Sequence, residues 1–135
     1  MVLVDSNVLL DLVTDDPLWA EWSMRQLEMA AVKGAVAIND VVYAEISIRY
    51  RRIEDLDAML ETAGIAIRPI PRAALFLAGK AFQRYRAAGG IRAGVLPDFF
   101  IGAHAAVAGI PLLTRDAGRY RSYFPSVALI APPPR

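Results

Sequence analysis

Four acidic residues, separated by long stretches of sequence, are the first candidates for chemistry: Asp5, Glu45, Asp98 and Asp116. Carboxylates that cluster repel one another and raise each other's pKa unless a cation neutralises them. Hard divalent cations such as Mg²⁺ are held by one or two carboxylates together with water and the phosphate of a substrate. If the four acids meet in the fold, they predict metal-assisted hydrolysis of a phosphodiester, with Mg²⁺ or alternatively Mn²⁺ as the cation.

Each acid also has a structural explanation. Asp98 and Asp116 stand where helices are expected to begin, and aspartate at such positions commonly caps a helix. Glu45 is harder to explain in this way, because its neighbours Val42 and Ile46 are apolar and glutamate is rarely buried without a partner. Asp5 ends an apolar run and raises the same question.

Short apolar runs and longer amphipathic segments alternate along the chain. Strands are predicted at Val2–Val4, Val36–Ile38, Ile65–Arg68, Ile110–Leu113 and Val127–Ile130. Helices are predicted over 7–13, 17–32, 41–50, 54–63, 71–88 and 98–109, with a short one around Arg119. This alternation predicts a single α/β domain over 1–131, with a parallel sheet of four to five strands between helices, followed by a proline-rich tail over 132–135.

The predicted layout gathers most of the acids at one edge of the sheet. Ligands of open α/β sheets bind outside the carboxyl ends of the strands, where the strand order reverses. Asp5 and Asp116 follow the first and fourth strands, and Glu45 lies on the helix after the second strand. Asp98 joins them only if its helix begins at the same edge.

Composition excludes several classes of protein. The 135 residues contain no cysteine, which rules out disulfides, thiol catalysis and thiolate-bound zinc. A net charge of +1 excludes a strongly basic nucleic-acid binder. The N-terminus lacks the features of a signal peptide and no apolar run reaches the length of a membrane span, so we expect a cytoplasmic protein without a membrane partner. The 56% hydrophobic content predicts a sheet covered on both faces or apolar surface reserved for a partner.

Four segments resemble the motifs of one family. VLVDSNVLLDL at the N-terminus, VYAEIS, LPDFFIGAHA and PLLTRDAGRYRSYFP are similar to those of PIN-domain ribonucleases, and within them to the VapC toxins of bacterial toxin–antitoxin pairs. The segments occur in the family's order and span nearly the whole chain.

The resemblance implies an Mg²⁺- or Mn²⁺-dependent endoribonuclease with four catalytic acids, Asp5, Glu45, Asp98 and Asp116. It implies that Asp5 and Asp98 bind the metal directly and that Asn7 and Thr114 orient an acid or a water. It further implies a homodimer whose RNA-cleaving site is blocked by a small cognate antitoxin.

Two arginines near these acids have two possible roles, whereas the only histidine has one. Arg92 lies close to Asp98 in the sequence and Arg115 adjoins Asp116, so each is a candidate either for contacting RNA phosphate or for pairing with an acid of the unliganded site. His104, six residues beyond Asp98 on the same predicted helix, points to a different side and is interpreted as structural.

Two other functions compete with nuclease activity. Phospho-accepting receiver-like domains also place acids at strand ends, but they need a lysine after the last strand, and the only lysines here, Lys33 and Lys80, lie on helices elsewhere. A non-catalytic RNA- or protein-binding module with a vestigial site is the second alternative, and the complete set of acids argues against it.

Overall fold

Five short strands form one parallel sheet in the computed structural model, which describes residues 1–133. They are β1 (Val2–Val4), β2 (Val36–Asn39), β3 (Ile65–Arg68), β4 (Leu112–Leu113) and β5 (Leu129–Ile130). Their order across the sheet is β3-β2-β1-β4-β5, and every neighbouring pair is parallel. The order reverses between β1 and β4, so the switch point of the sheet lies where the sequence analysis expects a ligand.

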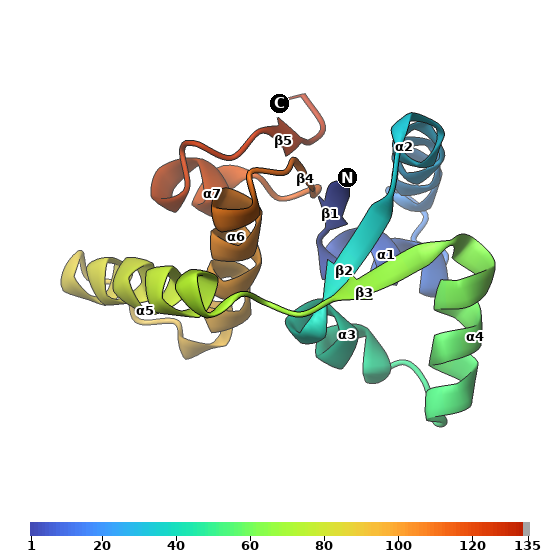
Figure 1. The fold of residues 1–135 in the computed structure, drawn as a ribbon, viewed down its shortest axis with the longest axis horizontal. Coiled ribbons are helices and arrows are strands. Elements are labelled where there is room, and N and C mark those ends of the chain that lie inside the picture. Colours follow the sequence, from blue (N-terminus) through green and yellow to red (C-terminus); the bar gives the residue numbers. More distant parts are fainter. Residues whose placement is uncertain (134–135) are drawn as a thin grey trace.

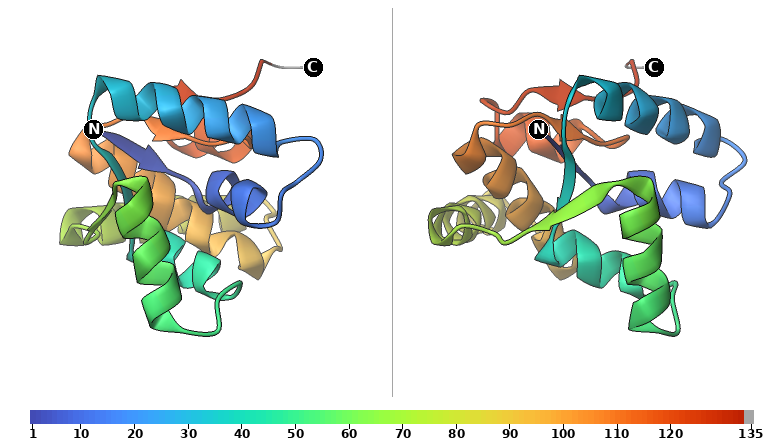
Figure 2. Two further views of the ribbon diagram at one scale, coloured as in Figure 1. Left: turned by 90° about the vertical axis from the view of Figure 1, so that its right-hand side faces the viewer. Right: turned by 45° about the vertical axis from the view of Figure 1, so that its right-hand side comes forward.

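Seven α-helices connect the strands within the described residues. They are α1 (Ser6–Val13), α2 (Ala20–Lys33), α3 (Asp40–Ser47), α4 (Ile53–Ala63), α5 (Arg72–Ala87), α6 (Leu96–Ala108) and α7 (Gly118–Tyr123), with a 3₁₀ turn at Ala93–Val95 before α6. Figure 1 shows α2 and α4 on one side of the strands and α5, α6 and α7 on the other. Figure 2 shows the same arrangement from two further directions. The predicted fold class is confirmed.

Two helix boundaries differ from the prediction by three residues, and the others by at most two. The second helix begins at Ala20 instead of Pro17, because the Asp16 carboxylate accepts hydrogen bonds from the backbone N–H groups of Leu18 and Trp19 and holds 17–19 in a turn. The third helix ends at Ser47 instead of Tyr50. The predicted tail over 132–135 extends beyond the described residues, which end at 133, and its boundary stays a prediction.

The sheet is covered on both faces, as its apolar strands require. Leu3, Ile38 and Leu112 are fully buried, one on each of three adjacent strands. Complete burial of such a side chain stabilises the fold by about 1.5–3 kcal/mol. In the described residues no helix combines the length and apolar character needed to cross a bilayer.

Two contacts fix α6 relative to the sheet and to α7. Asn39 at the end of β2 caps α3 through Val42 N–H at 3.0 Å, and its amide lies 3.1 Å from Nδ1 of the buried His104 on α6. On the other side of α6, a Cβ at Gly102 would lie 2.4 Å from the Phe124 ring. His104 therefore has a structural contact, and glycine is needed where Phe124 packs.

Candidate functional site

The first strand ends at the switch point of the sheet with a buried carboxylate. Val4 pairs with Leu113 on β4, so Asp5 and Thr114 directly follow two paired residues. The Asp5 backbone N–H donates to Leu113 O at 2.9 Å, which continues the strand pairing by one residue. This register places Asp5 and Thr114 side by side.

Asp5 is held by donors from three parts of the chain. Oδ2 accepts hydrogen bonds from the hydroxyls of Thr114 and Tyr120, both at 2.8 Å, and from Asn7 Nδ2 at 3.3 Å. Oδ1 accepts from Ser6 Oγ at 3.4 Å. Asp5 is only 3% exposed, and burial raises its pKa to about 6 although the hydrogen bonds from Tyr120 and Thr114 oppose the rise.

Glu45 on α3 joins Asp5 through Ser6. Ser6 Oγ lies 2.9 Å from Glu45 Oε1 and 3.4 Å from Asp5 Oδ1, so its single proton is within reach of both carboxylates and is closer to Glu45. Burial raises the pKa of Glu45, and the negative charges of Asp5 and Asp98 add to the rise. Glu45 is half-buried and faces the site, as its apolar neighbours indicated.

Asp98 reaches the same edge from the other face of the sheet. It stands in the first turn of α6 after Pro97, and its charge acts on Asp5, so this turn lies near the end of β1. Burial raises its pKa and the charge of Asp116 adds to this, while Arg119 lowers it. Arg119 Nη1 lies 2.5 Å from Asp98 Oδ2. The structure thus brings Asp98 to Asp5 and Glu45.

Asp116 lies at the rim. Its side chain is exposed, and its backbone N–H donates to Thr114 Oγ1 at 3.1 Å. Thr114 Oγ1 also accepts from Asn7 Nδ2 at 3.3 Å, and Asn7 Oδ1 accepts from the Arg115 backbone N–H at 3.3 Å. Asn7 and Thr114 therefore connect Asp5 to the loop that carries Asp116.

Within residues 1–133, neither candidate arginine forms an ion pair with one of the four acids. Arg115 Nε donates to both carboxylate oxygens of Asp11, at 2.9 and 3.1 Å, and its guanidinium lies over the Trp19 ring. Asp11 also accepts from Ser23 Oγ at 2.9 Å, so this cluster joins α1, α2 and the β4 loop. The Arg92 side chain is exposed, and its backbone N–H donates to the Tyr85 hydroxyl.

Sequence reasoning missed three residues of the site: Ser6, Arg119 and Tyr120. Ser6 directly follows Asp5, and this adjacency was a usable signal. Arg119 and Tyr120 lie in a run with Arg121, and only the orientation of α7 decides which of these side chains turns inward. The buried Tyr120 hydroxyl, whose pKa is raised well above its usual value by burial and by Asp5, fixes that orientation.

The donor set suits a hard divalent cation. Among residues 1–133 no three Asp, Glu or His side chains form a ready-made metal cage, and no buried side-chain nitrogen or oxygen lacks a hydrogen-bond partner. Mg²⁺ needs only one or two carboxylates, with water and substrate as its other ligands. The negative charge of Asp98 raises the pKa of Asp5, and a cation between them would neutralise this repulsion. The residues present therefore fit the predicted cation.

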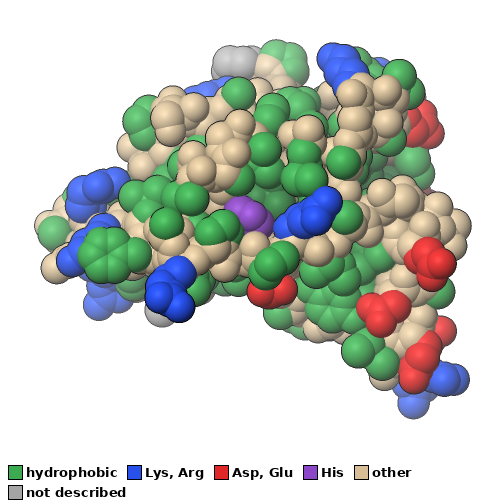
Figure 3. Space-filling model, in the orientation of Figure 1, with side chains coloured by type: hydrophobic (Ala, Val, Ile, Leu, Met, Phe, Trp, Pro, Cys, Tyr) green, Lys and Arg blue, Asp and Glu red, His purple; other side chains and the backbone are tan. Residues whose placement is uncertain are grey.

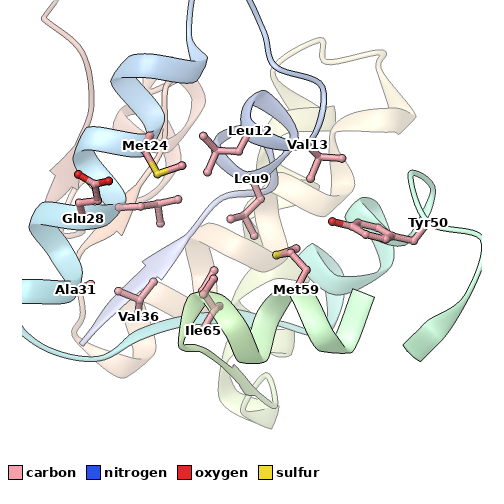
Figure 4. Close-up of a pocket in the computed structure, with 12 residues that line it drawn as sticks. Leu9, Leu12, Val13, Met24, Glu28, Ala31, Val36, Tyr50, Met59 and Ile65 are labelled. Carbon is pink, nitrogen blue, oxygen red and sulfur yellow. The ribbon is translucent and has the colours of Figure 1, made fainter. Parts of the chain in front are cut away.

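A separate apolar groove of about 460 Å³ lies between α1, α2 and α4. Figure 4 shows Leu9 and Leu12 of α1 and Met24 of α2 facing Met59 of α4 across it. Glu28 is the charged residue among those that line the groove. This groove is distinct from the carboxylate cluster and contains none of its residues.

Charge is distributed unevenly on the surface that Figure 3 shows. Acidic side chains gather over α4, and basic side chains gather over α5 (Figure 3). The net charge of the chain is near neutral, but basic side chains are concentrated on α5, the helix that precedes α6.

Comparison with known proteins identifies the fold independently. Residues 2–124 match the family model described as PIN domain. A search of curated proteins gives no match.

Several solved structures share the fold. The chain is 19% identical to a chain of VapBC2 from Rickettsia felis bound to a promoter DNA fragment, covering 97% of this chain and 98% of that one with a TM-score of 0.73. The chain is 15% identical to a chain of VapBC-1 from nontypeable Haemophilus influenzae, covering 97% of this chain and 98% of that one with a TM-score of 0.69. The chain is 20% identical to a chain of a toxin–antitoxin complex from Klebsiella pneumoniae, covering 95% of this chain and 96% of that one with a TM-score of 0.62.

Proposed function

The chain belongs to the PIN domain family, and from this we propose that it is a divalent-cation-dependent endoribonuclease acting as the toxin of a toxin–antitoxin pair. PIN domains are generally nucleases. The observation that carries the proposal is the meeting of Asp5, Glu45 and Asp98 at the switch point of the sheet, where the pKa of each is raised by burial and by negative charge. The proposed place of action is the cytoplasm, where cellular RNA is accessible.

Asp5 and Asp98 are the proposed ligands of Mg²⁺ or Mn²⁺, with Glu45 and Asp116 completing the negative site. When bound, the cation would polarise a phosphoryl oxygen and lower the pKa of water for attack on phosphorus. Asp5 ends a strand of the sheet and Asp98 begins helix α6, so their separation depends on the packing of α6 against β2 and α7.

The surrounding residues hold the acids in place. Thr114 and Tyr120 fix Oδ2 of Asp5, and Asn7 supports Thr114 from α1. Ser6 holds Glu45 at a fixed distance from Asp5, where Glu45 can accept a proton from a water that approaches the phosphate. Hydrogen bonds of this kind preorganise a site before the substrate arrives.

RNA phosphate would meet basic side chains on one side of the acids. Arg92 is exposed just before α6, and basic side chains gather over the preceding helix α5 (Figure 3). Arg115 contributes differently, because its guanidinium is committed to Asp11 and its effect on the site passes through the β4 loop. We therefore assign phosphate contact to Arg92 and a positioning role to Arg115.

The groove between α1, α2 and α4 is the proposed contact of the antitoxin. Its apolar lining suits the apolar side of an amphipathic helix, and Glu28 at its edge suits a basic residue beside that apolar side. Known toxin–antitoxin complexes with this fold support such a partner. A second copy of the chain is the proposed partner of α5, where Leu75 and Phe76 expose apolar surface.

The positions of the two lysines argue against a receiver-like phosphorylation domain, which needs a lysine after the last strand. Lys33 ends α2 just before β2 and therefore lies towards the amino ends of the strands, opposite Asp5. Lys80 lies within α5. Neither location suits a lysine that holds a phosphate on Asp5.

The test is cleavage of RNA by the purified protein with Mg²⁺ or Mn²⁺, with a chelator in parallel. Asp98→Asn should abolish cleavage without changing the fold, and Asp57→Asn, which alters an exposed acid on α4, should leave it unchanged. Equal cleavage by wild type and Asp98→Asn would show that the proposed mechanism is wrong. Transfer of phosphate from a donor to Asp5, without RNA cleavage, would establish the signalling function instead.

A further inference from the structure

Arg119 occupies the carboxylate that the proposed cation needs. Its Nη1 lies 2.5 Å from Asp98 Oδ2, with the two side chains 23% and 31% exposed. Among the ion pairs found within residues 1–133, this is the one that involves an acid of the site; the others are Arg25–Glu21, Arg52–Glu54 and Arg115–Asp11.

This pair is more than a surface contact. Asp98 is partly buried, so its negative charge needs a partner, and Arg119 both donates a hydrogen bond and supplies the opposite charge. Surface pairs with fully hydrated partners contribute little, whereas a pair at a desolvated carboxylate is held more firmly. In the cation-free protein, Arg119 therefore acts as the counter-ion of Asp98.

A second contact gives the guanidinium another place to lie. Arg119 Cζ is 6.0 Å from the centroid of the Tyr85 ring on α5, within the range of a cation–π interaction. The helix that carries Arg119 is anchored by its neighbour Tyr120, which is buried and bonded to Asp5. Arg119 can thus leave Asp98 by a side-chain movement that keeps the Tyr85 contact and leaves α7 in place.

Building on the cation-dependent function proposed above, we propose that Arg119 is an internal competitor of the divalent cation: it holds Asp98 before loading and is displaced from Oδ2 when the cation binds. A carboxylate oxygen that accepts a hydrogen bond from a guanidinium is a weaker ligand, and a guanidinium beside a divalent cation repels it. Arg119 is a positioning residue in this proposal. Arg119 sets the cation concentration at which Asp98 binds the cation. When the cation binds, the guanidinium moves away from Asp98 and keeps its contact with Tyr85.

The test measures cation binding to the RNA-free protein. Mn²⁺ is titrated into wild type, Arg119→Gln and Arg121→Gln, with free Mn²⁺ followed by electron paramagnetic resonance. Arg121 is exposed on the same helix, so its substitution removes the same charge without touching Asp98. We expect Arg119→Gln to bind Mn²⁺ about tenfold more tightly than wild type, as the loss of one charge-assisted hydrogen bond implies, and Arg121→Gln to change the affinity much less.

A conservative variant of Arg119 and the magnetic resonance signal of its guanidinium provide two further measurements. Arg119→Lys retains the charge but loses the planar fork, so its affinity should lie between those of wild type and Arg119→Gln; it also serves if Arg119→Gln does not fold. In wild type, the Arg119 Nε–H signal in ¹⁵N nuclear magnetic resonance should shift when diamagnetic Mg²⁺ is added.

The outcomes separate this inference from the proposed function. Binding by wild type with no tightening in Arg119→Gln beyond that in Arg121→Gln overturns the competition. An unshifted Arg119 signal at saturating Mg²⁺ overturns the displacement. Absence of Mn²⁺ and Mg²⁺ binding in wild type and in all three variants contradicts the cation-dependent function itself.

Discussion

The Tyr120 hydroxyl donates a 2.8 Å hydrogen bond to Oδ2 of Asp5, across 115 positions of the sequence. The bond joins the short helix α7 to the end of the first strand. Because it favours the ionised carboxylate, it lowers the pKa of Asp5 against the larger effect of burial. Tyr120 therefore helps to set the pH at which Asp5 is available as a ligand.

Tyr120→Phe should shift the acidic limb of the pH profile of RNA cleavage to higher pH. Loss of the hydroxyl removes a hydrogen bond that lowers the pKa of Asp5, so that pKa should rise above about 6. The free energy of unfolding should fall by about 1–2 kcal/mol, as expected for a hydrogen bond to a charged group. Tyr123→Phe, within the aromatic cluster of α5, α6 and α7, is the matched control. An unchanged profile in Tyr120→Phe would contradict this role.

Ionisation of Asp5 should lower the stability of the cation-free protein as pH rises from about 4 to above 6. The folded pKa of Asp5 is raised from 3.8 to about 6, so folding favours its neutral form. The stabilisation is complete below the unfolded pKa and is lost as pH passes the folded pKa, amounting to about 3 kcal/mol. Glu45 and Asp98 shift in the same direction.

Chemical denaturation of wild type and Asp5→Asn at pH 4 and pH 8, both in chelator, measures the contribution of Asp5 to the pH dependence of stability. Asp5→Asn should gain stability relative to wild type at pH 8. Saturating Mg²⁺ should stabilise wild type but not the variant. A pH-independent difference between the two proteins would show that Asp5 is not the source.

Gly102→Ala should destabilise the fold by about 1–3 kcal/mol and reduce RNA cleavage, because a Cβ there would overlap the Phe124 ring and displace α7. Gly79→Ala is the matched control. It lies inside α5 with no neighbour within 4 Å of the added carbon, so it should raise stability by about 0.5–1 kcal/mol. Thermal unfolding and RNA cleavage of both variants provide the readouts. Equal stabilities would rule out the proposed overlap.

Arg115→Met should lower stability by about 2 kcal/mol, because it leaves the Asp11 carboxylate, 2% exposed, with only Ser23 as its partner. Arg92→Met should leave stability unchanged and weaken RNA binding in the Asp98→Asn background. Denaturant unfolding and filter binding distinguish the two effects. If Arg115→Met is as stable as wild type but binds RNA weakly, the assignments of the two arginines must be exchanged.

Met24→Glu should abolish binding of the antitoxin while leaving RNA cleavage unchanged, because Met24 lines the apolar groove far from the acids. Val32→Glu, on an exposed position of the same helix outside the groove lining, should bind normally. The probe is the purified cognate antitoxin, and its binding can be followed by calorimetry. Normal binding by Met24→Glu would exclude this groove as the contact.

The strands and the placement of Asp5 could be predicted because they depend on local pattern. Val2–Val4 is apolar and ends at Asp5, and parallel pairing alone puts Asp5 beside the residue that follows β4. The position of Asp98 could not be derived in the same way. It depends on how far α5 and α6 travel before the chain returns to the sheet, and on the contact of His104 with Asn39.

The partners of the arginines were equally inaccessible from sequence. Arg115 adjoins Asp116, yet it pairs with Asp11, because the side chain turns towards α1 where the chain leaves β4. Arg119 reaches Asp98 from 21 positions away. Neither partner is a sequence neighbour, so only the packing of α1 and α7 against the sheet determines these pairs.

The bonds from Thr114 and Tyr120 to Asp5 have a consequence for the timing of synthesis. Asp5 is made before Thr114 and Tyr120, its two donors at 2.8 Å, which follow it by 109 and 115 positions. A growing chain that has completed β1, β2 and β3 still lacks both donors and the ligand-bearing segment of α6. The set of hydrogen bonds to Asp5 is therefore complete only once the chain has been made as far as Tyr120, while it is still close to the RNA that encodes it.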